Sequence, residues 1–261
     1  HGEVPKSSGL IAVGKQSRSG AGDSGRGEII IAGQDACLDM LINHASENRS
    51  KGSPQLLRSQ VGSYNGLYAM YSGRTTASAA HLWDAATDTY NYPYISRLLP
   101  GVRTAALRLC GRTQGAYVKR GNPKGIRSWE DLKNPDVRLI NRERGSGTRI
   151  LLDQKLRLLG IEPDAITGYG TESSSHLSIV SAVAVGIADV GFGCENPAKS
   201  VDGVEFIPLQ LEWYDLVIRQ SDLEKPLVRE IVDFGGSAGF RAMLEAVGGY
   251  DLSQSGVYAE L

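Results

Sequence analysis

The sequence predicts an α/β protein with two lobes, each a mainly parallel sheet flanked by helices. Short apolar runs, turns and stretches with apolar residues at helical spacing follow one another repeatedly, as in successive βα units. The extended segment 103–119 exceeds the length of a typical strand, and a strand at 213–219 is placed to bring the chain back. Two lobes joined by such crossings are suited to close on a small ligand by hinge motion.

The first lobe is predicted to comprise residues 28–115 and 212–261. Its strands are apolar runs that end at turns, expected at 28–32, 56–61 and 77–82. Asp35 is placed to cap the helix that follows the first strand, and the Gly62-Ser63 turn starts the next helix. Pro226 and Ser237 stand at the start of two closing helices.

The second lobe is predicted at residues 116–211. Ser128 and Asp131 have the spacing of a capping box. Its strands are expected at 137–140, 187–192 and 204–209, and its helices at about 150–159 and 174–185. Within the first lobe, residues 84–101 are rich in tyrosine and proline and are predicted to be irregular.

Composition excludes several classes of protein. The chain has 261 residues, 41% of them hydrophobic, and a net charge of −1, which fits a globular protein. The absence of lysine- or arginine-rich runs argues against direct nucleic-acid binding. No apolar run has the length of a membrane span, so membrane insertion is not expected. Three cysteines without paired spacing favour a reducing compartment over a disulfide scaffold.

Residues 1–27 are predicted to form a flexible segment. They are rich in Gly, Ser and charge and lack the apolar core of a signal peptide. A processed terminus, a tag remnant and a linker to an upstream part all remain open. The compartment therefore stays unknown, with a slight preference for the cytoplasm.

The stretch Asn141–Arg149 carries the strongest site signal. It joins an apolar strand to an amphipathic helix, so its residues form the turn and the first helical turn. Gly145 and Gly147 let the backbone approach a ligand, while Ser146 and Thr148 offer hydroxyls. Free amides, the helix dipole and two arginines in this stretch, Arg144 and Arg149, are the components of an anion site.

Other side chains are weaker candidates. His81 ends the third predicted strand, and ligands of open α/β sheets bind beyond the carboxyl ends of strands. His176 stands near a helix start, where a solvated cap is the simpler interpretation. Cys194 lacks the partner signals of a catalytic thiol, and no metal-ligand spacing occurs. No catalytic residue, metal site or cofactor is therefore predicted.

Three segments resemble one family: Asn141–Arg149, Ala182–Gly193 and Trp213–Val217. They are similar to the periplasmic-binding-protein-like domain related to molybdate- and tungstate-binding proteins, which also forms the ligand-sensing part of some transcription regulators. The resemblance covers roughly residues 28–250. It implies a type 2 periplasmic-binding-protein fold that holds a small anionic ligand between the lobes, without catalysis.

The resemblance also indicates where the ligand would bind. In the second lobe the matching positions are Arg144, Gly145, Ser146, Gly147, Thr148 and Arg149. In the first lobe they are the turn positions Gln34, Asp35, Ser63 and Tyr64, to which the strand-end argument adds His81. Gln34 departs from the His or Ser expected beside the aspartate, which leaves the ligand's identity open.

Several functions remain open at this point. The first hypothesis is capture of a molybdate- or tungstate-like oxyanion for uptake or sensing, with Arg144 and Arg149 neutralising its charge. The second is a sensor module for a larger ligand such as a pterin, and the third is a metal-cation carrier that uses His81. For uptake, the expected partner is a membrane permease. For sensing, it is a DNA-binding subunit, because no helix-turn-helix segment occurs in the chain.

Overall fold

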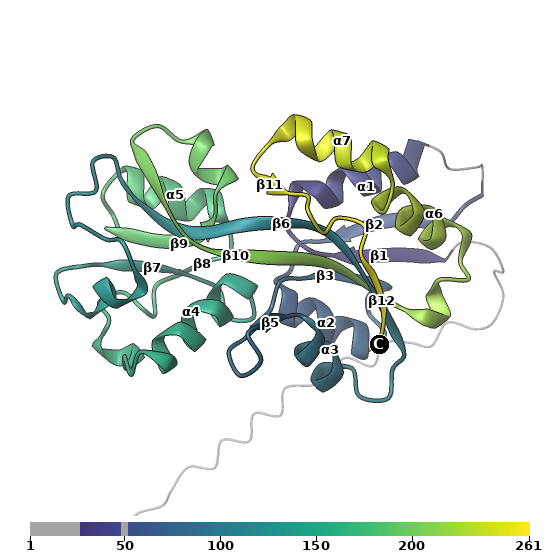
Figure 1. The fold of residues 1–261 in the computed structure, drawn as a ribbon, viewed down its shortest axis with the longest axis horizontal. Coiled ribbons are helices and arrows are strands. Elements are labelled where there is room, and N and C mark those ends of the chain that lie inside the picture. The colour runs from purple at the N-terminus through teal and green to yellow at the C-terminus, as the bar shows by residue number, and fades with distance from the viewer. Residues whose placement is uncertain (1–26, 48–51) are drawn as a thin grey trace, which may run out of the picture.

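Two lobes lie side by side along the longest axis of the molecule (Figure 1). The computed structural model describes residues 27–47 and 52–261, so the segment predicted to be flexible, 1–27, lies almost entirely outside the described residues. Within the described ranges, no helix has the length and apolar character needed to cross a membrane. The structure confirms the predicted two-lobed α/β fold.

Three parallel strands form the centre of each lobe. In lobe 1 they are β1 (Glu28–Ala32), β2 (Gln55–Ser59) and β3 (Ala77–Ala80). In lobe 2 they are β7 (Leu139–Arg142), β8 (Glu172–Ser173) and β9 (Val190–Cys194). The side chains of β3, β7 and β9 are buried on both faces, as expected for strands covered by helices on each side.

Two long antiparallel strands, β6 (Thr104–Lys119) and β10 (Val204–Arg219), cross from one lobe to the other (Figure 1). β10 pairs with β3 in lobe 1, and β6 pairs with β9 in lobe 2. They join both lobes in one ten-stranded sheet. Eight of its strands follow the order β2-β1-β3-β10-β6-β9-β7-β8, and two short strands near the C-terminus also pair with β6. Because no other strand among the described residues crosses from one lobe to the other, β6 and β10 are where a hinge motion would bend.

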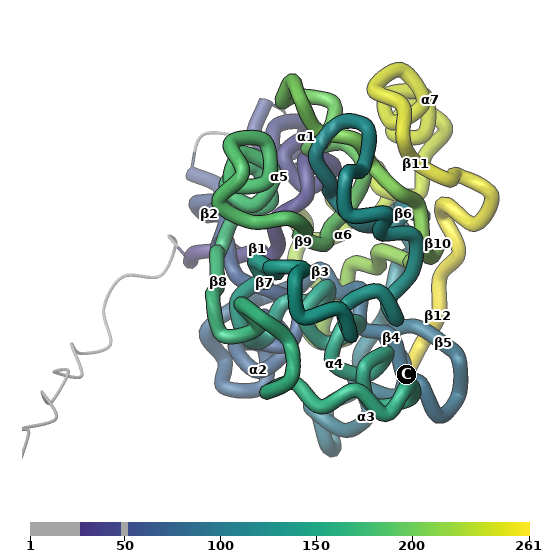
Figure 2. The backbone as a smooth tube through the Cα atoms, turned by 90° about the vertical axis from the view of Figure 1, so that its left-hand side faces the viewer, coloured from purple at the N-terminus to yellow at the C-terminus, as the bar shows by residue number. Residues whose placement is uncertain are grey.

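Helices cover both faces of the sheet, as the view from the lobe 2 end shows for α5 and α4 (Figure 2). In lobe 1, α1 (Ala36–Glu47), α6 (Pro226–Gly235) and α7 (Ala238–Val247) enclose one core with Ile29, Ile31 and Leu216. The opposite face holds α2 (Ser63–Tyr71) and α3 (Tyr92–Leu98). In lobe 2, α4 (Gly147–Leu158) and α5 (His176–Ala184) cover the two faces.

The structure differs from the sequence-based expectation in two places. Segment 84–101, expected to be irregular, contains α3 and one strand of the hairpin formed by β4 (Trp83–Asp84) and β5 (Thr89–Tyr90). The strands expected at 204–209 and 213–219 are one continuous strand, β10. Its pairing with β6 shifts in register between Pro208 and Gln210, so the strand continues through the residues between the two expected segments. The capping box at Ser128 and Asp131 is present as predicted.

Hairpin β4–β5 also qualifies the predicted division into lobes. Trp83 and Tyr90 belong by chain position to lobe 1, yet they pack in the core that α4 covers in lobe 2. Gln154 of α4 accepts a hydrogen bond from Ala85 N at 2.9 Å and donates to Tyr94 Oη at 2.9 Å. The hairpin region therefore packs against α4 of lobe 2. Two short strands near the C-terminus, β11 (Tyr250–Asp251) and β12 (Tyr258–Glu260), pair with the lobe 1 part of β6.

The lobes touch at the amino ends of α2 and α4. Tyr64 N donates to Gly145 O at 3.0 Å, and the Asn65 side-chain amide donates to Arg144 O at 3.3 Å. Gly62 makes this approach possible, since a Cβ on it would lie 2.6 Å from Ser146 Cα. Its φ of −66° suits any residue, so the close contact, and not backbone strain, is what demands glycine here.

Gly62→Ala is therefore expected to push the lobes apart without disturbing either lobe. The added methyl group would collide with the backbone of the opposite lobe, and only a small opening at the hinge relieves the collision. Small-angle X-ray scattering should show a larger radius of gyration than in the wild type. Gly170→Ala is the matched control, because a Cβ there has no neighbour within 4 Å; equal radii for both variants would contradict the interpretation.

Candidate ligand-binding cleft

A cavity of about 600 Å³ lies between the lobes, in front of the crossing strands. Lobe 1 contributes the turns after β1 and β2 and the end of β3, including Gln34, Ser63 and His81. Lobe 2 contributes Arg142, Ser146 and the loop into α5. The volume falls within the range of about 300–1,000 Å³ typical of small-molecule sites.

Four helices begin at the wall of this cleft: α1, α2, α4 and α5. Asp35 caps α1, its carboxylate accepting from Cys37 N at 2.8 Å. Ser146 and Ser175 are the N-caps of α4 and α5 and accept from the amides three residues on. The first amides of any helix lack intrahelical partners, and each amino end carries a partial positive charge of about half a unit. The backbone alone thus gives the cleft a positive potential.

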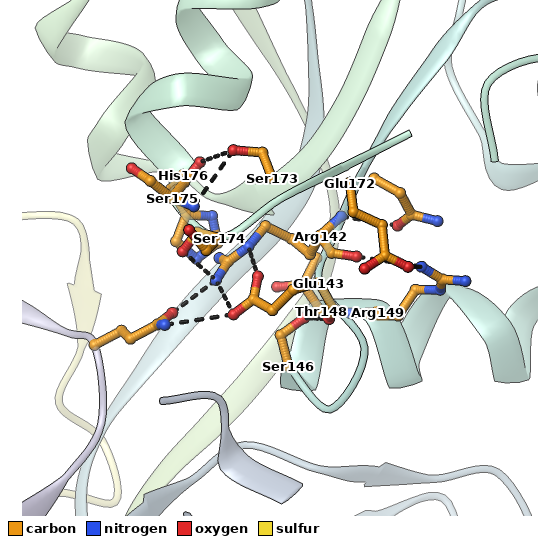
Figure 3. A network of polar contacts seen from close by, with 12 residues as sticks. Arg142, Glu143, Ser146, Thr148, Arg149, Glu172, Ser173, Ser174, Ser175 and His176 are labelled. Carbon is orange, nitrogen blue, oxygen red and sulfur yellow. Dashed lines mark hydrogen bonds and ion pairs between the residues drawn. The ribbon is translucent and has the colours of Figure 1, made fainter. Parts of the chain in front are cut away.

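Arg142 is the cationic side chain best placed to meet an anion. It is the last residue of β7, its side chain is 1% exposed, and it lines the cleft. Glu143 accepts from its Nε at 2.9 Å and from its Nη2 at 3.0 Å, a two-point pairing. The same Nη2 donates to Gln34 of lobe 1 at 2.6 Å and to Ser174 O at 3.3 Å. Figure 3 shows this network at the meeting point of the two lobes.

A second arginine, Arg112, is buried at the base of the cleft on β6. Its Nη1 donates to Asp35 at 2.6 Å, its Nη2 pairs with Glu212, and its guanidinium lies 4.1 Å from the centre of the Tyr214 ring. Burial raises the pKa of Asp35 and of Glu212, but it is outweighed by Arg112 together with hydrogen bonds from Cys37 to Asp35 and from His81 and Gln114 to Glu212, so both pKa values are lowered. Both carboxyls are therefore ionised at neutral pH, and their two negative charges more than balance the single positive charge of Arg112.

Two histidines face each other's lobes across the cleft. His81 Nδ1 lies 2.8 Å from Glu212 Oε2 at the end of β3. His176, predicted to be a solvated cap, is instead half-buried in the cleft wall, and its Nδ1 lies 3.5 Å from Tyr117 Oη. Burial, then Arg142 and Arg112, hold the pKa of His176 well below its usual value. His176 is consequently neutral at physiological pH and offers hydrogen bonds without charge.

Cys194 also lines the cleft, but its surroundings suppress thiol chemistry. The residue is 6% exposed, and burial raises the pKa of its thiol to about 12. The reactive thiolate form is therefore scarce at neutral pH. In the described ranges no group of three or more His, Cys, Asp and Glu side chains is arranged to hold a metal ion.

The structure brings five of the residues predicted from the sequence to the cleft: Gln34, Asp35, Ser63, His81 and Ser146. Their common feature is that they stand at strand ends or helix starts that face the opposite lobe. Asp35 caps α1 as predicted. Its carboxylate is used within the protein by Arg112, by Cys37 N and by Tyr250 Oη, the last at 2.9 Å.

The other six predicted residues do not line the cleft: Tyr64, Arg144, Gly145, Gly147, Thr148 and Arg149. The Arg144 side chain is 85% exposed and points away to pair with Glu172 at 3.5 Å. Arg149 is buried but turned along α4, where it pairs with Asp153 at 2.9 Å and with Glu172 at 3.1 Å. Gly147 packs on His81, and Gly145 on Asn65, so these glycines serve contact between the lobes.

Sequence reasoning missed Arg112 and Arg142. For Arg112 a signal existed, because an arginine inside a long apolar strand requires buried carboxylates nearby. For Arg142 the signal was the position itself, the carboxyl end of a buried strand, from which ligands of α/β sheets are commonly contacted.

The fold and the cleft define a two-lobed protein of the type 2 periplasmic-binding-protein class. Residues 45–235 match the model of the PBP superfamily domain, so the chain belongs to this family. It is 40% identical over 232 residues to the uncharacterised Bacillus subtilis (strain 168) protein YvgK, covering 89% of this chain and 73% of YvgK. An uncharacterised Clostridium pasteurianum protein from the 5′ region of a 2Fe-2S ferredoxin gene is 48% identical over 107 residues, 41% of this chain and 95% of that protein.

Solved structures support the same fold at low sequence identity. A putative phosphate ABC transporter substrate-binding protein with bound phosphate from Clostridium perfringens has a TM-score of 0.62 and 14% identity, covering 86% of this chain and 98% of the other. The tungstate ABC transporter of Geobacter sulfurreducens gives 0.61 and 11%, over 84% and 98%. The effector-binding domain of QuiR in complex with shikimate gives 0.57 and 14%, over 80% and 95%.

The buried Arg112 group generates a stability prediction. Arg112→Met leaves Asp35 and Glu212 without their cation, and breaking a buried ion pair on one side costs about 3–5 kcal/mol. Urea unfolding at pH 7 should show this loss. Arg120→Met is the control, because Arg120 is 72% exposed and 4.0 Å from Asp202, and exposed pairs contribute about 0–1 kcal/mol. Similar losses in both variants would contradict the assignment.

The same variant should respond to pH with the opposite sign to the wild type. In the wild type both carboxyls have lowered pKa values, so their stabilising contribution is complete above about pH 4 and is lost as the pH falls further. Without Arg112, burial would raise the pKa of both groups, and the variant would gain stability on protonation. The difference in unfolding free energy between the two proteins should therefore shrink from pH 7 to pH 5.

Proposed function

We propose that this protein binds a small anionic ligand between its lobes and performs no catalysis. The observation that carries the proposal is the convergence of Arg142 with the amino ends of α1, α2, α4 and α5 on one cleft. Backbone amides and a guanidinium are the groups that hold oxyanions and carboxylates in proteins. Closure of the lobes makes the affinity, because neither lobe surrounds the cleft alone.

The first candidate ligand is a tetrahedral oxyanion of the molybdate or tungstate type, with phosphate as the alternative. Two proteins of similar fold support it: one was solved with bound phosphate, and another belongs to a tungstate transporter. Hydroxyls of Ser63 and Ser146, together with helix amides, would supply hydrogen bonds from both lobes. Arg142, and not Arg144 or Arg149, would neutralise the charge.

A larger organic anion, such as a pterin, is the second candidate. It is favoured by the cavity of about 600 Å³, which extends from Arg142 to Tyr214 and Tyr250 and exceeds the space that a single tetrahedral anion needs. Aromatic walls suit a flat ring, and the charged end would point to Arg142. The effector-binding domain with shikimate bound shows that this fold also accommodates cyclic organic acids.

Either ligand would serve uptake through a membrane permease or sensing through a DNA-binding subunit. The chain spans 73% of YvgK, so that relative contains residues with no counterpart here. A partner segment that binds the closed form of the lobes better than the open form would be consistent with both uptake and sensing.

A panel of ligands should separate the candidates. Isothermal titration calorimetry with molybdate, tungstate, phosphate, sulfate and a reduced pterin is expected to show saturable binding of at least one anion. Thermal shift gives a second readout, since a ligand at 100 times its Kd stabilises by about 2.7 kcal/mol. If none of the five binds by either method, the anion-binding proposal fails.

Arg142→Gln is expected to weaken anion binding about 100-fold, which corresponds to roughly 2.7 kcal/mol, because a buried charge partner of the ligand is lost. Arg144→Gln is the matched control: it removes the same charge two residues away, on a side chain that is 85% exposed, and should change affinity less than about threefold. A larger loss of affinity in Arg144→Gln than in Arg142→Gln would indicate that the anion binds at the turn predicted from the sequence. Urea unfolding of both variants verifies that they fold.

A further inference from the structure

The Arg142 guanidinium is already paired with a carboxylate of the protein itself. The Glu143 carboxylate pairs with Nε and Nη2 of Arg142 at 2.9 and 3.0 Å. This is the two-point geometry in which a guanidinium binds a carboxylate or oxyanion ligand. The protein's own carboxylate therefore occupies the guanidinium atoms of Arg142 that could otherwise pair with a ligand, and Figure 3 shows this pairing.

Glu143 also reaches the opposite lobe. Its Oε1 accepts from the Gln34 side-chain amide at 3.4 Å, while the carbonyl oxygen of that amide accepts from Arg142 at 2.6 Å. Gln34 follows β1 in lobe 1, whereas the other two residues lie at the end of β7 in lobe 2. The three side chains thus form a polar bridge between the two lobes, as a bound anion would.

The surroundings allow Glu143 to leave while Arg142 stays. The Glu143 backbone is fixed, because its carbonyl accepts from Ser146 Oγ at 2.9 Å and its amide donates to Ser173 O at 3.2 Å. Its side chain, however, is 22% exposed, against 1% for Arg142. Arg142 is further held by Ser174 O. Rotation of the glutamate side chain into solvent would free the fork without moving the arginine.

We propose that Glu143 is an internal ligand of Arg142, which occupies the guanidinium and bridges to Gln34 until an external anion replaces it. This inference rests on the proposed anion-binding function. Binding is then an exchange of one carboxylate for another anion, and the carboxylate sets how much anion the protein needs before it responds. Gln34, which departs from the residue expected at this turn, accepts and donates at once and so suits the bridging role.

The test is Glu143→Gln, with Glu172→Gln as the matched control. Both changes remove one negative charge, and Glu172 pairs with Arg149 and Arg144 outside the cleft. Affinities for tungstate, phosphate and formate are measured by calorimetry at constant ionic strength. Glu143→Gln should raise the affinity for every anion that binds, by about tenfold and by the same factor, since each anion displaces the same competitor. Glu172→Gln should leave all affinities within about twofold.

Three results would overturn the inference. Unchanged affinities in Glu143→Gln would mean that the carboxylate does not compete, and lowered affinities would make Glu143 a positioning residue for Arg142. A gain that is much larger for divalent tungstate than for monovalent formate would indicate a through-space field effect and not displacement. These outcomes differ from failure of the proposed function, in which neither the wild type nor Glu143→Gln binds these three anions or any ligand of the five-member panel.

Discussion

The burial of Arg112 is the constraint on which the geometry of the cleft depends. Its guanidinium is placed in the interior of β6, where both crossing strands leave lobe 1, and its charge must be met there. Asp35 at the start of α1 and Glu212 on β10 meet it, and Glu212 in turn contacts His81 at the end of β3. One buried charge thus fixes the positions of a helix start, a strand end and a crossing strand relative to one another. Such a group contributes position more than net stability.

This arrangement divides the labour between the two arginines of the cleft. Arg112 pairs with two carboxylates, Asp35 and Glu212, at the base of the cleft, so this group offers no net positive charge to a ligand. Arg142 has a single carboxylate partner, Glu143, attached to a partly exposed side chain. The positive potential available to a ligand therefore comes from Arg142 and from the helix amino ends. This is why the proposed anion-binding role falls to Arg142.

Much of the fold was predictable because its signals are local. Apolar runs gave the strands of both lobes, and caps such as Asp35, Ser146 and Ser237 gave the helix starts. Segment 84–101 was misjudged because its tyrosines and prolines suggested a loop, whereas burial of Trp83 and Tyr90 against lobe 2 organises a hairpin there. That packing joins residues distant in sequence, and local patterns do not report it.

The site was harder to predict than the fold, since it depends on side-chain direction. The stretch Asn141–Arg149 contains arginine or glutamate side chains at three successive positions, 142–144, and a further arginine at its end, yet strand pleat and helix rotation send them to different surroundings. Arg142 ends a strand and faces the cleft, Arg144 sits in a turn open to solvent, and Arg149 lies along α4. Charge and spacing locate the neighbourhood of a site. Which charged side chain faces the cleft depends on the partner that it finds once the chain has folded: Arg142 pairs with Glu143, whereas Arg144 and Arg149 pair with Glu172.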